Sequence, residues 1–206
     1  MRPIRLNYTP DVADLTRYLS NATGATWTLT ETASSDSLAH TITILNNSTT
    51  DHSAKTAILT GTDSMGRILT ETLNLPAASA TVTSARYFKT LTSIVPSATI
   101  GTDAMDIGQG AGVSSIAIPL NWRGGITSVN LDITGTADVT VQNTFDDVQH
   151  ESNFDYAWQD SPASSLVNVT TSTNDAYDGL PTALRLIFNS LSAGASVVIT
   201  IIQRDI

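Results

Sequence analysis

The sequence has no cysteine among its 206 residues, which excludes disulfides, thiolate metal sites and cysteine nucleophiles. This absence suits a protein made in a reducing cytoplasm. No apolar run approaches the roughly 20 residues that are needed to span a bilayer. The N-terminal residues, MRPIRLNYTPDV, lack the apolar core of a secretory signal peptide. We therefore expect neither secretion nor membrane insertion.

Charged residues are also scarce, at 14% of the chain, where about a quarter is usual. Only ten residues are Lys or Arg, and the net charge is −9. Nucleic-acid binding needs clustered basic side chains that neutralise phosphates, and the densest basic group here is only Arg2, Arg5 and Arg17. The composition argues against direct nucleic-acid binding. Arg2 and Arg5 could instead dock on an acidic protein surface, although ordinary solvated charge explains them as well.

Serine and threonine fill the place of the missing charges and make up about a quarter of the chain. Threonine is stiff at χ1 and suits a pleated sheet surface. A surface of hydroxyl groups is typical of extended β assemblies, because hydroxyl groups are easier than charges to bury against a partner. The alternative interpretation of this composition is a plain secreted all-β domain.

The stretch from Lys55 to Val95 predicts a three-stranded antiparallel meander. Residues 55–62 form the first strand, and Asp63-Ser64-Met65-Gly66 forms a tight turn, because Asp bonds its own backbone and Gly supplies a positive φ. Residues 67–75 alternate, with Glu71 as an exception on the leucine face, and Pro76 ends the strand. Residues 81–94 alternate again and predict one long third strand.

The segments GTDSMGRILTET and TVTSARYFKTLTSI, preceded by SSDSLAHTITI, resemble a sequence pattern found in structural proteins of tailed bacteriophages. The matching residues are Gly61, Thr62, Asp63, Gly66, Thr70, Glu71, Thr72 and Tyr87 to Ile94. The resemblance covers between about a third and a half of the chain, and it is a resemblance of folding pattern, so it carries over no functional residues. It implies a virion component that decorates or cements the capsid, or else a tail or neck protein.

Two β domains are expected, of residues 21–100 and 114–206, after an N-terminal segment of residues 1–20. Thr9, Pro10 and Asp11 have the chemistry of a helix start, so Pro10 to Ser20 predicts a short helix. The alternative is an extended arm that pairs with a neighbouring subunit. Gly108, Gly110 and Gly112 lie between the domains and predict a flexible linker. A dinucleotide-binding loop is rejected there, because a strand-like run follows instead of a helix.

The second half predicts six or seven strands at spacings of 8–12 residues, which indicates an antiparallel β-sandwich and loosely resembles the jelly-roll-like domains of phage proteins. Residues 195–203 predict a central strand, residues 166–170 another strand, and residues 174–181 a turn. The fold class is therefore all-β, with antiparallel β-sandwich or jelly-roll-like domains.

The loop from Asp146 to Pro162 is the main candidate site. Its acidic residues suggest either a paired-carboxylate hydrolase or a cation site, although their spacing matches no EF-hand; they are Asp146, Asp147, Glu151, Asp155 and Asp160. Its aromatic residues suggest sugar stacking or, as the preferred interpretation, a subunit contact. We therefore predict that Tyr156, Trp158 and the loop residue Trp122 contribute to a protein–protein interface.

No cofactor or metal is predicted. The histidines, at positions 40, 52 and 150, form no zinc-binding pair and are expected in loops or at the surface. No G-x-S-x-G elbow marks a serine nucleophile. The function expected is structural and non-enzymatic: a phage capsid decoration or cement protein, with the major capsid protein and further copies of itself, in a trimer, as partners. It would be assembled into virions in the bacterial cytoplasm. A tail or neck protein and a carbohydrate-binding module remain as alternatives.

Overall fold

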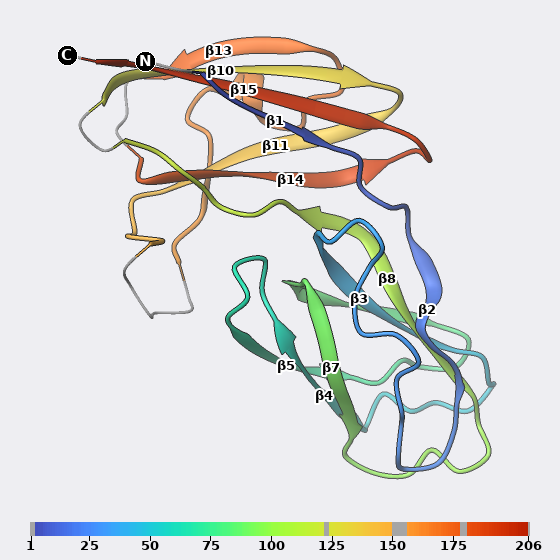
Figure 1. The fold of residues 1–206 in the computed structure, drawn as a ribbon. Coiled ribbons are helices and arrows are strands. Elements are labelled where there is room, and N and C mark those ends of the chain that lie inside the picture. Colours follow the sequence, from blue (N-terminus) through green and yellow to red (C-terminus); the bar gives the residue numbers. More distant parts are fainter. Residues whose placement is uncertain (1–2, 122–123, 150–155, 178–180, 206) are drawn as a thin grey trace. The chain divides into compact units, whose positions relative to one another are not determined.

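A computed structural model describes residues 3–121, 124–149, 156–177 and 181–205. The chain forms two compact units (Figure 1). Unit 1 joins the N-terminal residues up to Asp11 with the residues from Ser114 onward, and unit 2 consists of Val12–Val113. Strands dominate both units, and the described residues include no α-helix. The prediction of an all-β, sandwich-like fold is confirmed.

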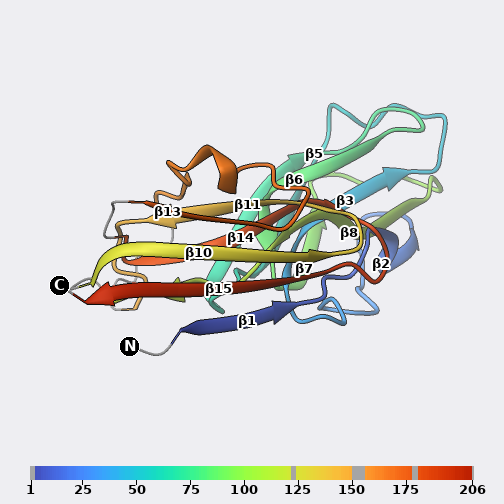
Figure 2. The same cartoon turned by 90° about the horizontal axis from the view of Figure 1, so that it is seen from above.

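Unit 1 contains a four-stranded antiparallel sheet in the order β1-β15-β10-β13. Its strands are β1 (Ile4–Tyr8), β10 (Gly124–Thr134), β13 (Thr173–Tyr177) and β15 (Ser196–Asp205). Figure 2 shows β1 along one side of β15 and β10 along the other. Residues 195–203 were expected to form a central strand, and β15 is indeed an inner strand of this sheet.

The second sheet of unit 1 has the order β12-β11-β14, with β9 also paired to β14. Its strands are β9 (Ile118–Pro119), β11 (Ala137–Thr144), β12 (Gln159–Asp160) and β14 (Ala183–Leu191). The two sheets pack as layers, and the ring of Tyr8 on β1 meets that of Phe188 on β14 edge to face at 6.2 Å. Alternation places Val197, Ile199 and Ile201 in the core between them, all almost completely buried.

Unit 2 contains a sheet in the order β2-β8-β3-β6 and a three-stranded sheet in the order β5-β4-β7. The first comprises β2 (Asp14–Ala22), β3 (Ala39–Asn46), β6 (Thr81–Phe88) and β8 (Met105–Ser114). The second comprises β4 (Thr56–Thr62), β5 (Ile68–Asn74) and β7 (Thr90–Pro96). Their apolar faces share one core, which includes Ile42, Leu59, Phe88, Leu91 and Ile107.

The predicted hairpin at Asp63–Gly66 is confirmed. One carboxylate oxygen of Asp63 accepts hydrogen bonds from the backbone N–H groups of Met65 and Arg67, at 2.8 and 2.9 Å. Gly66 has a φ of +81°, a conformation that favours glycine. The turn therefore sets the register of β4 against β5, in which Thr62 pairs with Ile68.

The meander differs from the prediction in its third strand. Residues 81–94 form two strands, β6 and β7, which belong to different sheets. The change of sheet occurs at Lys89, whose N–H donates to the carbonyl of Thr62. Phe88 and Leu91, on the two sides of Lys89, are both fully buried. An alternating pattern cannot show such a change, because each half alternates correctly by itself.

The helix predicted from Pro10 to Ser20 does not form, because residues 14–22 form β2. The helical pattern placed Leu15 and Leu19 on the buried face, but Leu15 is 40% exposed, whereas Tyr18 is fully buried. Long-range pairing of β2 with β8 overrides the local signals of a helix start. The start of the N-terminal segment of residues 1–20 forms β1, which pairs with β15 of the same chain, whereas the alternative to the helix was an extended arm that pairs with a neighbouring subunit. The described residues contain no helix that is long and apolar enough to cross a membrane.

The glycine-rich segment predicted as a flexible linker is instead largely the buried strand β8. Its glycines are needed for close packing and not for flexibility. A Cβ atom at Gly108 would lie 2.1 Å from the carbonyl oxygen of Asp14, and one at Gly110 would lie 2.3 Å from Oγ1 of Thr41. Both contacts are far too short for a side chain, so glycine lets the neighbouring strands approach.

Three smaller predictions also need correction. Residues 174–181 were expected to turn, but Asn174 to Tyr177 belong to β13. The strand expected at residues 166–170 is a 3-10 turn, η1 (Ser164–Leu166), followed by a single bridge at Val169. The alternation of Ala25, Trp27 and Leu29 with threonines also predicts a strand from the sequence, but Trp27 forms only a single bridge, to Ile94.

Candidate functional site

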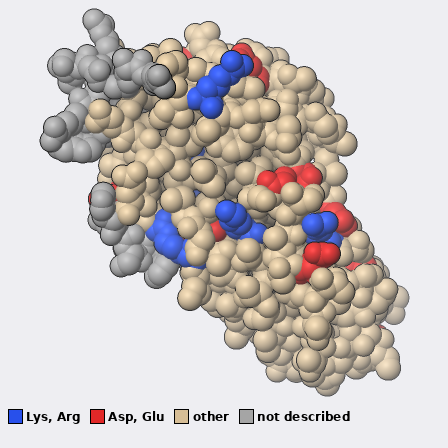
Figure 3. Space-filling model, in the orientation of Figure 1, with Lys and Arg blue, Asp and Glu red and all other residues tan. Residues whose placement is uncertain are grey.

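Charge is spread thinly over the described surface. On the face drawn in Figure 3, the Lys and Arg side chains of the described residues lie apart from one another, and several have acidic neighbours. Elsewhere among the described residues, Nε of Arg67 lies 3.6 Å from the carboxylate of Asp63. The described residues on that face therefore form no continuous basic surface of the kind that tracks a phosphate backbone.

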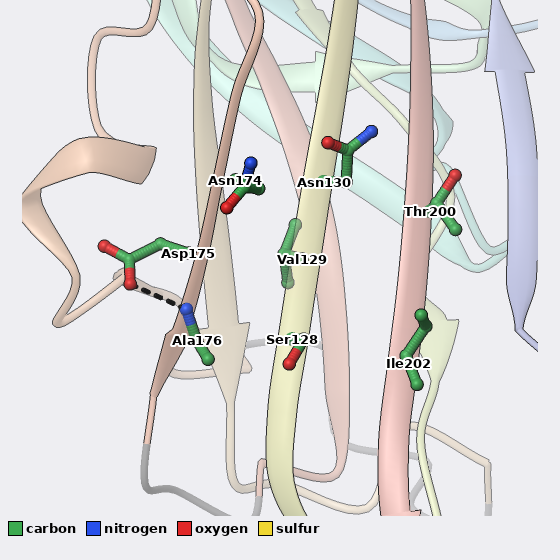
Figure 4. Close-up of a pocket in the computed structure, with 8 residues that line it drawn as sticks. All are labelled: Ser128, Val129, Asn130, Asn174, Asp175, Ala176, Thr200 and Ile202. Carbon is green, nitrogen blue, oxygen red and sulfur yellow. Dashed lines mark hydrogen bonds between the residues drawn. The ribbon is translucent and has the colours of Figure 1, made fainter.

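A hollow of unit 1 lies on the outer face of the sheet β1-β15-β10-β13 and has a volume of about 450 Å³. Three strands place its side chains in two rows (Figure 4). Asn174, Asn130 and Thr200 face one another across the strands and form the first row. The second row is Ala176, Ser128 and Ile202. Ala176 and Ser128 are the short side chains of the hollow, and the larger side chains of Asn130, Asn174 and Ile202 stand beside them.

The hydrogen-bonding groups of this hollow are available to a ligand. The side chains of Asn130, Asn174, Ser128 and Thr200 make no hydrogen bond to any other described residue. Carboxamide and hydroxyl groups can both donate and accept. Ile202, which is 51% exposed, adds an apolar wall. The hollow therefore offers neutral polar groups beside an apolar side chain.

Among the described residues that line the hollow, Asp175 alone is acidic, and its carboxylate is already engaged. It accepts hydrogen bonds from the hydroxyl of Ser165 and from the backbone N–H of Ala176, the latter at 2.7 Å. These bonds, the hydroxyl bond above all, hold the pKa of Asp175 below its usual value. Asp175 therefore fixes η1 beside β13 and is not available as a proton donor.

The structure brings two of the predicted interface residues together. Tyr156 and Trp158 are half-buried and pack on a small cluster of Ala117, Val148 and Ala183. The guanidinium carbon of Arg185 lies 4.4 Å from the centre of the Trp158 ring, which is a cation–π contact. Arg5 lies on the outer face of β1 and is exposed, in a different element from the two aromatic residues. Arg2 and Trp122 lie outside the described residues.

The described acidic residues of the loop each accept hydrogen bonds from nearby groups of unit 1. Asp146 accepts hydrogen bonds from the backbone N–H of Ala157, at 2.6 Å, and from the hydroxyl of Thr144. Asp147 accepts one from the N–H of Gln149, and Asp160 accepts one from the side chain of Gln142. Glu151 and Asp155 lie outside the described residues. Within the described part of the chain, no three His or acidic residues are grouped as metal ligands.

Two histidines are buried: His40 lies on a strand, which corrects the prediction of a loop or surface position, whereas His52 lies in the loop before β4, as that prediction allowed. His40 is fully buried on β3, and its Nε2 lies 2.8 Å from Asp36, whose other carboxylate oxygen accepts from the hydroxyl of Ser34. Serine and histidine therefore share one carboxylate and do not contact each other as a catalytic pair does. The burial of His40 also closes this group to a substrate.

His52 is the second buried histidine, at 3% exposure, and it links three segments of unit 2. Its Nε2 lies 2.9 Å from the carboxylate of Asp103, and its Nδ1 lies 3.1 Å from Nζ of Lys55. Lys55 also donates to the carbonyl of Thr99. The ring therefore joins β4 to the segment before β8 and has a structural place. His150 lies outside the described residues.

A second candidate surface, here called the threonine face, is the outer face of the sheet β5-β4-β7. It exposes three aliphatic side chains, Ile58 (45%), Ile68 (72%) and Val95 (54%). Ile58 and Val95 are direct cross-strand neighbours. Hydroxyl and amide side chains occupy the remaining outward positions of these strands; they are Thr56, Thr60, Thr62, Thr70, Thr72, Asn74, Thr90 and Ser93.

Sequence reasoning missed both surfaces. The signal for the hollow was the run Ser128, Asn130 and Asp132, whose polarity marks one face of a strand, but its partners on β13 lay in a predicted turn. The signal for the threonine face was that Ile58 and Ile68 alternate in step with the threonines of their strands and not with the buried leucines. A search of known family models, of curated proteins and of solved structures finds no match to this chain.

Proposed function

We propose that this protein is a non-enzymatic structural component of a tailed-phage virion, most specifically a decoration or cement protein that binds the major capsid protein as a homo-oligomer. The proposal starts from the resemblance of the segment around the hairpin to phage structural proteins. Every residue of the turn that carries this resemblance has an architectural part in unit 2. Asp63 closes the turn, and Gly66 supplies its left-handed conformation.

The observation that carries the proposal is that the resembling segment builds the threonine face. Two of its three strands, β4 and β5, are joined by the turn that carries the resemblance. The third strand, β7, includes the end of the second segment that carries it, TVTSARYFKTLTSI. This face presents aliphatic side chains and hydroxyl groups but no side chain that could serve as a nucleophile activated by a base. Such a surface can bind a partner protein by burying surface area against it.

The mechanism would be binding energy rather than chemistry. Burial of apolar surface stabilises a contact by roughly 25 cal/mol per Å², from which the loss of freedom on association is subtracted. A shell repeats the same contact many times, so a modest single contact would be multiplied over the lattice. The protein would then hold neighbouring capsid subunits together against the pressure of packaged DNA. A trimer fits three-fold joints of a shell and is the assembly that we favour.

Immunogold labelling of purified virions tests the proposal. We expect gold particles spread over the head of intact particles. Labelling confined to the neck or tail would instead support the tail or neck alternative. Absence of label on intact particles, when the epitope is shown to be accessible to the antibody, would contradict a place on the virion surface. Cosedimentation of the purified protein with shells that lack it gives an independent measurement of the same binding.

A carbohydrate-binding module is the second candidate, and the hollow on the outer face of unit 1 supports it. Free carboxamide and hydroxyl groups beside an apolar side chain match the polar edge and apolar face of a sugar ring. Nuclear magnetic resonance titration with glucose, galactose and N-acetylglucosamine tests this candidate. Shifts of Asn130 and Asn174 signals that Asn130→Ala removes would support it. The acidic loop is tested in parallel with Asp147→Ala, and no shift at either place would remove this candidate.

A further inference from the structure

The polar row of the hollow in unit 1 continues onto β1. Arg5 pairs directly with Thr200, which in turn pairs with Asn130. Residues that stand directly opposite each other on neighbouring strands point to the same face of a sheet, so Arg5 lies on the outer face, where it is exposed. The four strands therefore present one row of side chains, in the order Arg5, Thr200, Asn130 and Asn174.

The guanidinium of Arg5 is available to a ligand, because Arg5 makes no ion pair or side-chain hydrogen bond with another described residue. Directly opposite Cβ atoms lie about 4.5–5.5 Å apart across a sheet. An arginine side chain is longer than this distance, so the guanidinium of Arg5 can reach a group bound above Thr200. Its N–H donors form a planar fork that fits the two oxygens of a carboxylate. Arg5 therefore adds an anion-binding group to the neutral groups of the hollow.

The other charged groups of this face limit the ligand to a single negative charge. Asp132 lies two residues along β10 from Asn130 and on the same face, and Asp175 lines the hollow beside Asn174. Among the side chains described on this face, one arginine therefore stands near two carboxylates, on a chain with a net charge of −9. A phosphate group carries a charge of about −1.5 to −2 at pH 7. A carboxylate, which Arg5 alone can neutralise, suits this balance better than a phosphate.

The neutral part of the hollow is suited to a sugar ring. Its volume of about 450 Å³ lies toward the lower end of the range of small-molecule sites, roughly 300–1,000 Å³. Asn130, Asn174 and Thr200 offer donors and acceptors to ring hydroxyls, and Ile202 offers an apolar contact to ring C–H groups (Figure 4). A plain aliphatic carboxylate would leave these donors and acceptors unused.

We propose that the outer face of this sheet binds a sugar that carries one carboxylate, a uronic acid. The carboxylate binds Arg5, and the sugar hydroxyls bind Asn130 and Asn174. The proposal rests on the carbohydrate-binding candidate above and narrows its ligand to acidic sugars. It is independent of the virion function, which uses the threonine face of unit 2.

Nuclear magnetic resonance titration of the full chain with glucuronate, glucose and acetate tests this assignment. We expect glucuronate to shift the backbone signals of Ser128, Asn130 and Thr200. It should bind at least about threefold more tightly than glucose, since an exposed ion pair contributes a modest gain. This difference should shrink as the salt concentration is raised, because salt screens exposed charges. Acetate should bind more weakly than glucuronate, because it lacks the hydroxyl groups.

Variants separate the two parts of the site. Arg5→Gln should lose the preference, so that glucuronate and glucose bind with equal affinity. Arg86→Gln is the matched control, since it removes the same charge from an exposed position on β6 in unit 2, and it should keep the preference for glucuronate. Asn130→Ala should weaken the binding of both sugars by similar factors, because it changes the neutral part of the hollow.

Equal affinities of the wild type for glucuronate and glucose would overturn the proposal and keep the carbohydrate-binding candidate. A preference that survives Arg5→Gln, or that Arg86→Gln also removes, would show a general effect of charge and would overturn it as well. Acetate that binds as tightly as glucuronate would overturn the assignment of a sugar. No shift with either sugar would remove both the proposal and the candidate, whereas virion labelling decides the virion function separately.

Discussion

Glu71 on β5 binds the free edge of β6, where its carboxylate accepts a hydrogen bond from the backbone N–H of Ala85 at 2.8 Å. The second carboxylate oxygen accepts one from the N–H of Arg86 at 3.0 Å. Glu71 is the residue that interrupts the leucine face in the sequence. The carboxylate accepts the backbone hydrogen bonds that the carbonyls of a neighbouring strand would otherwise accept at this edge. It thereby links the two sheets of unit 2.

We predict that Glu71→Ala lowers the free energy of unfolding by roughly 1–2 kcal/mol, since two backbone donors lose a charged acceptor at a partly solvated position. Urea unfolding followed by circular dichroism measures the change. Thr72→Ala, the next residue on the same strand and an exposed one, is the matched control and should shift stability by less than about 0.5 kcal/mol. Equal effects of the two variants would show that the carboxylate does not hold this edge.

Tyr18 gives a prediction about alkaline pH. Its side chain is fully buried, and its hydroxyl has no hydrogen-bond partner among the described residues. Burial raises the pKa of Tyr18 to about 12, although the nearby Arg17 opposes the shift and Asp36 adds to it. The unfolded chain loses this proton near pH 10. Unfolding therefore releases a proton between pH 10 and 12, and stability falls as pH rises through this window.

We expect Tyr18→Phe to remove this part of the alkaline loss, which amounts to roughly 2 kcal/mol by pH 12. At pH 7 the variant should be as stable as the wild type or slightly more stable, because it removes a buried hydroxyl that has no partner. Urea unfolding at pH 8 and pH 11 compares the two proteins. A parallel alkaline loss in both would show that Tyr18 ionises as readily in the folded chain as in the unfolded chain.

Gly108 tests whether the glycine-rich segment is a strand. A Cβ atom there would meet backbone atoms of Asp14 and Leu15 at 2.1–2.4 Å, so Gly108→Ala should force β2 away from β8 and cost about 1–3 kcal/mol. At Gly112 the corresponding contacts are with side-chain atoms at 3.1–3.4 Å, so Gly112→Ala should cost less. Thermal unfolding ranks the two. A flexible linker would tolerate both substitutions equally.

The hairpin turn gives a fourth prediction. Asp63→Ala removes the acceptor of two backbone N–H groups, those of Met65 and Arg67, and should destabilise unit 2 by about 1–2 kcal/mol. Ser64→Ala changes a neighbouring turn residue whose side chain makes no hydrogen bond to a described residue, so it should have little effect. Chemical denaturation measures both. Comparable losses would mean that the turn does not depend on the Asp63 carboxylate.

The sequence by itself determined the β character of the chain and the hairpin at Asp63 and Gly66. Alternation with period two is a local property of a strand, and Asp and Gly act within the few residues of a turn. The sequence also predicted that residues 195–203 form an inner strand, because both faces of that strand carry apolar residues.

Only the tertiary structure decided which strands are neighbours. The helix expected before Ser20 became β2 because β8 lies beside it, and the glycines of β8 suit that close approach. The division at Lys89 and the bonding of Glu71 to β6 likewise depend on residues far apart in the sequence. A strand can pair with any free edge that fits, so local pattern leaves the partner open. Both candidate surfaces depend on such pairings, which align side chains from three strands.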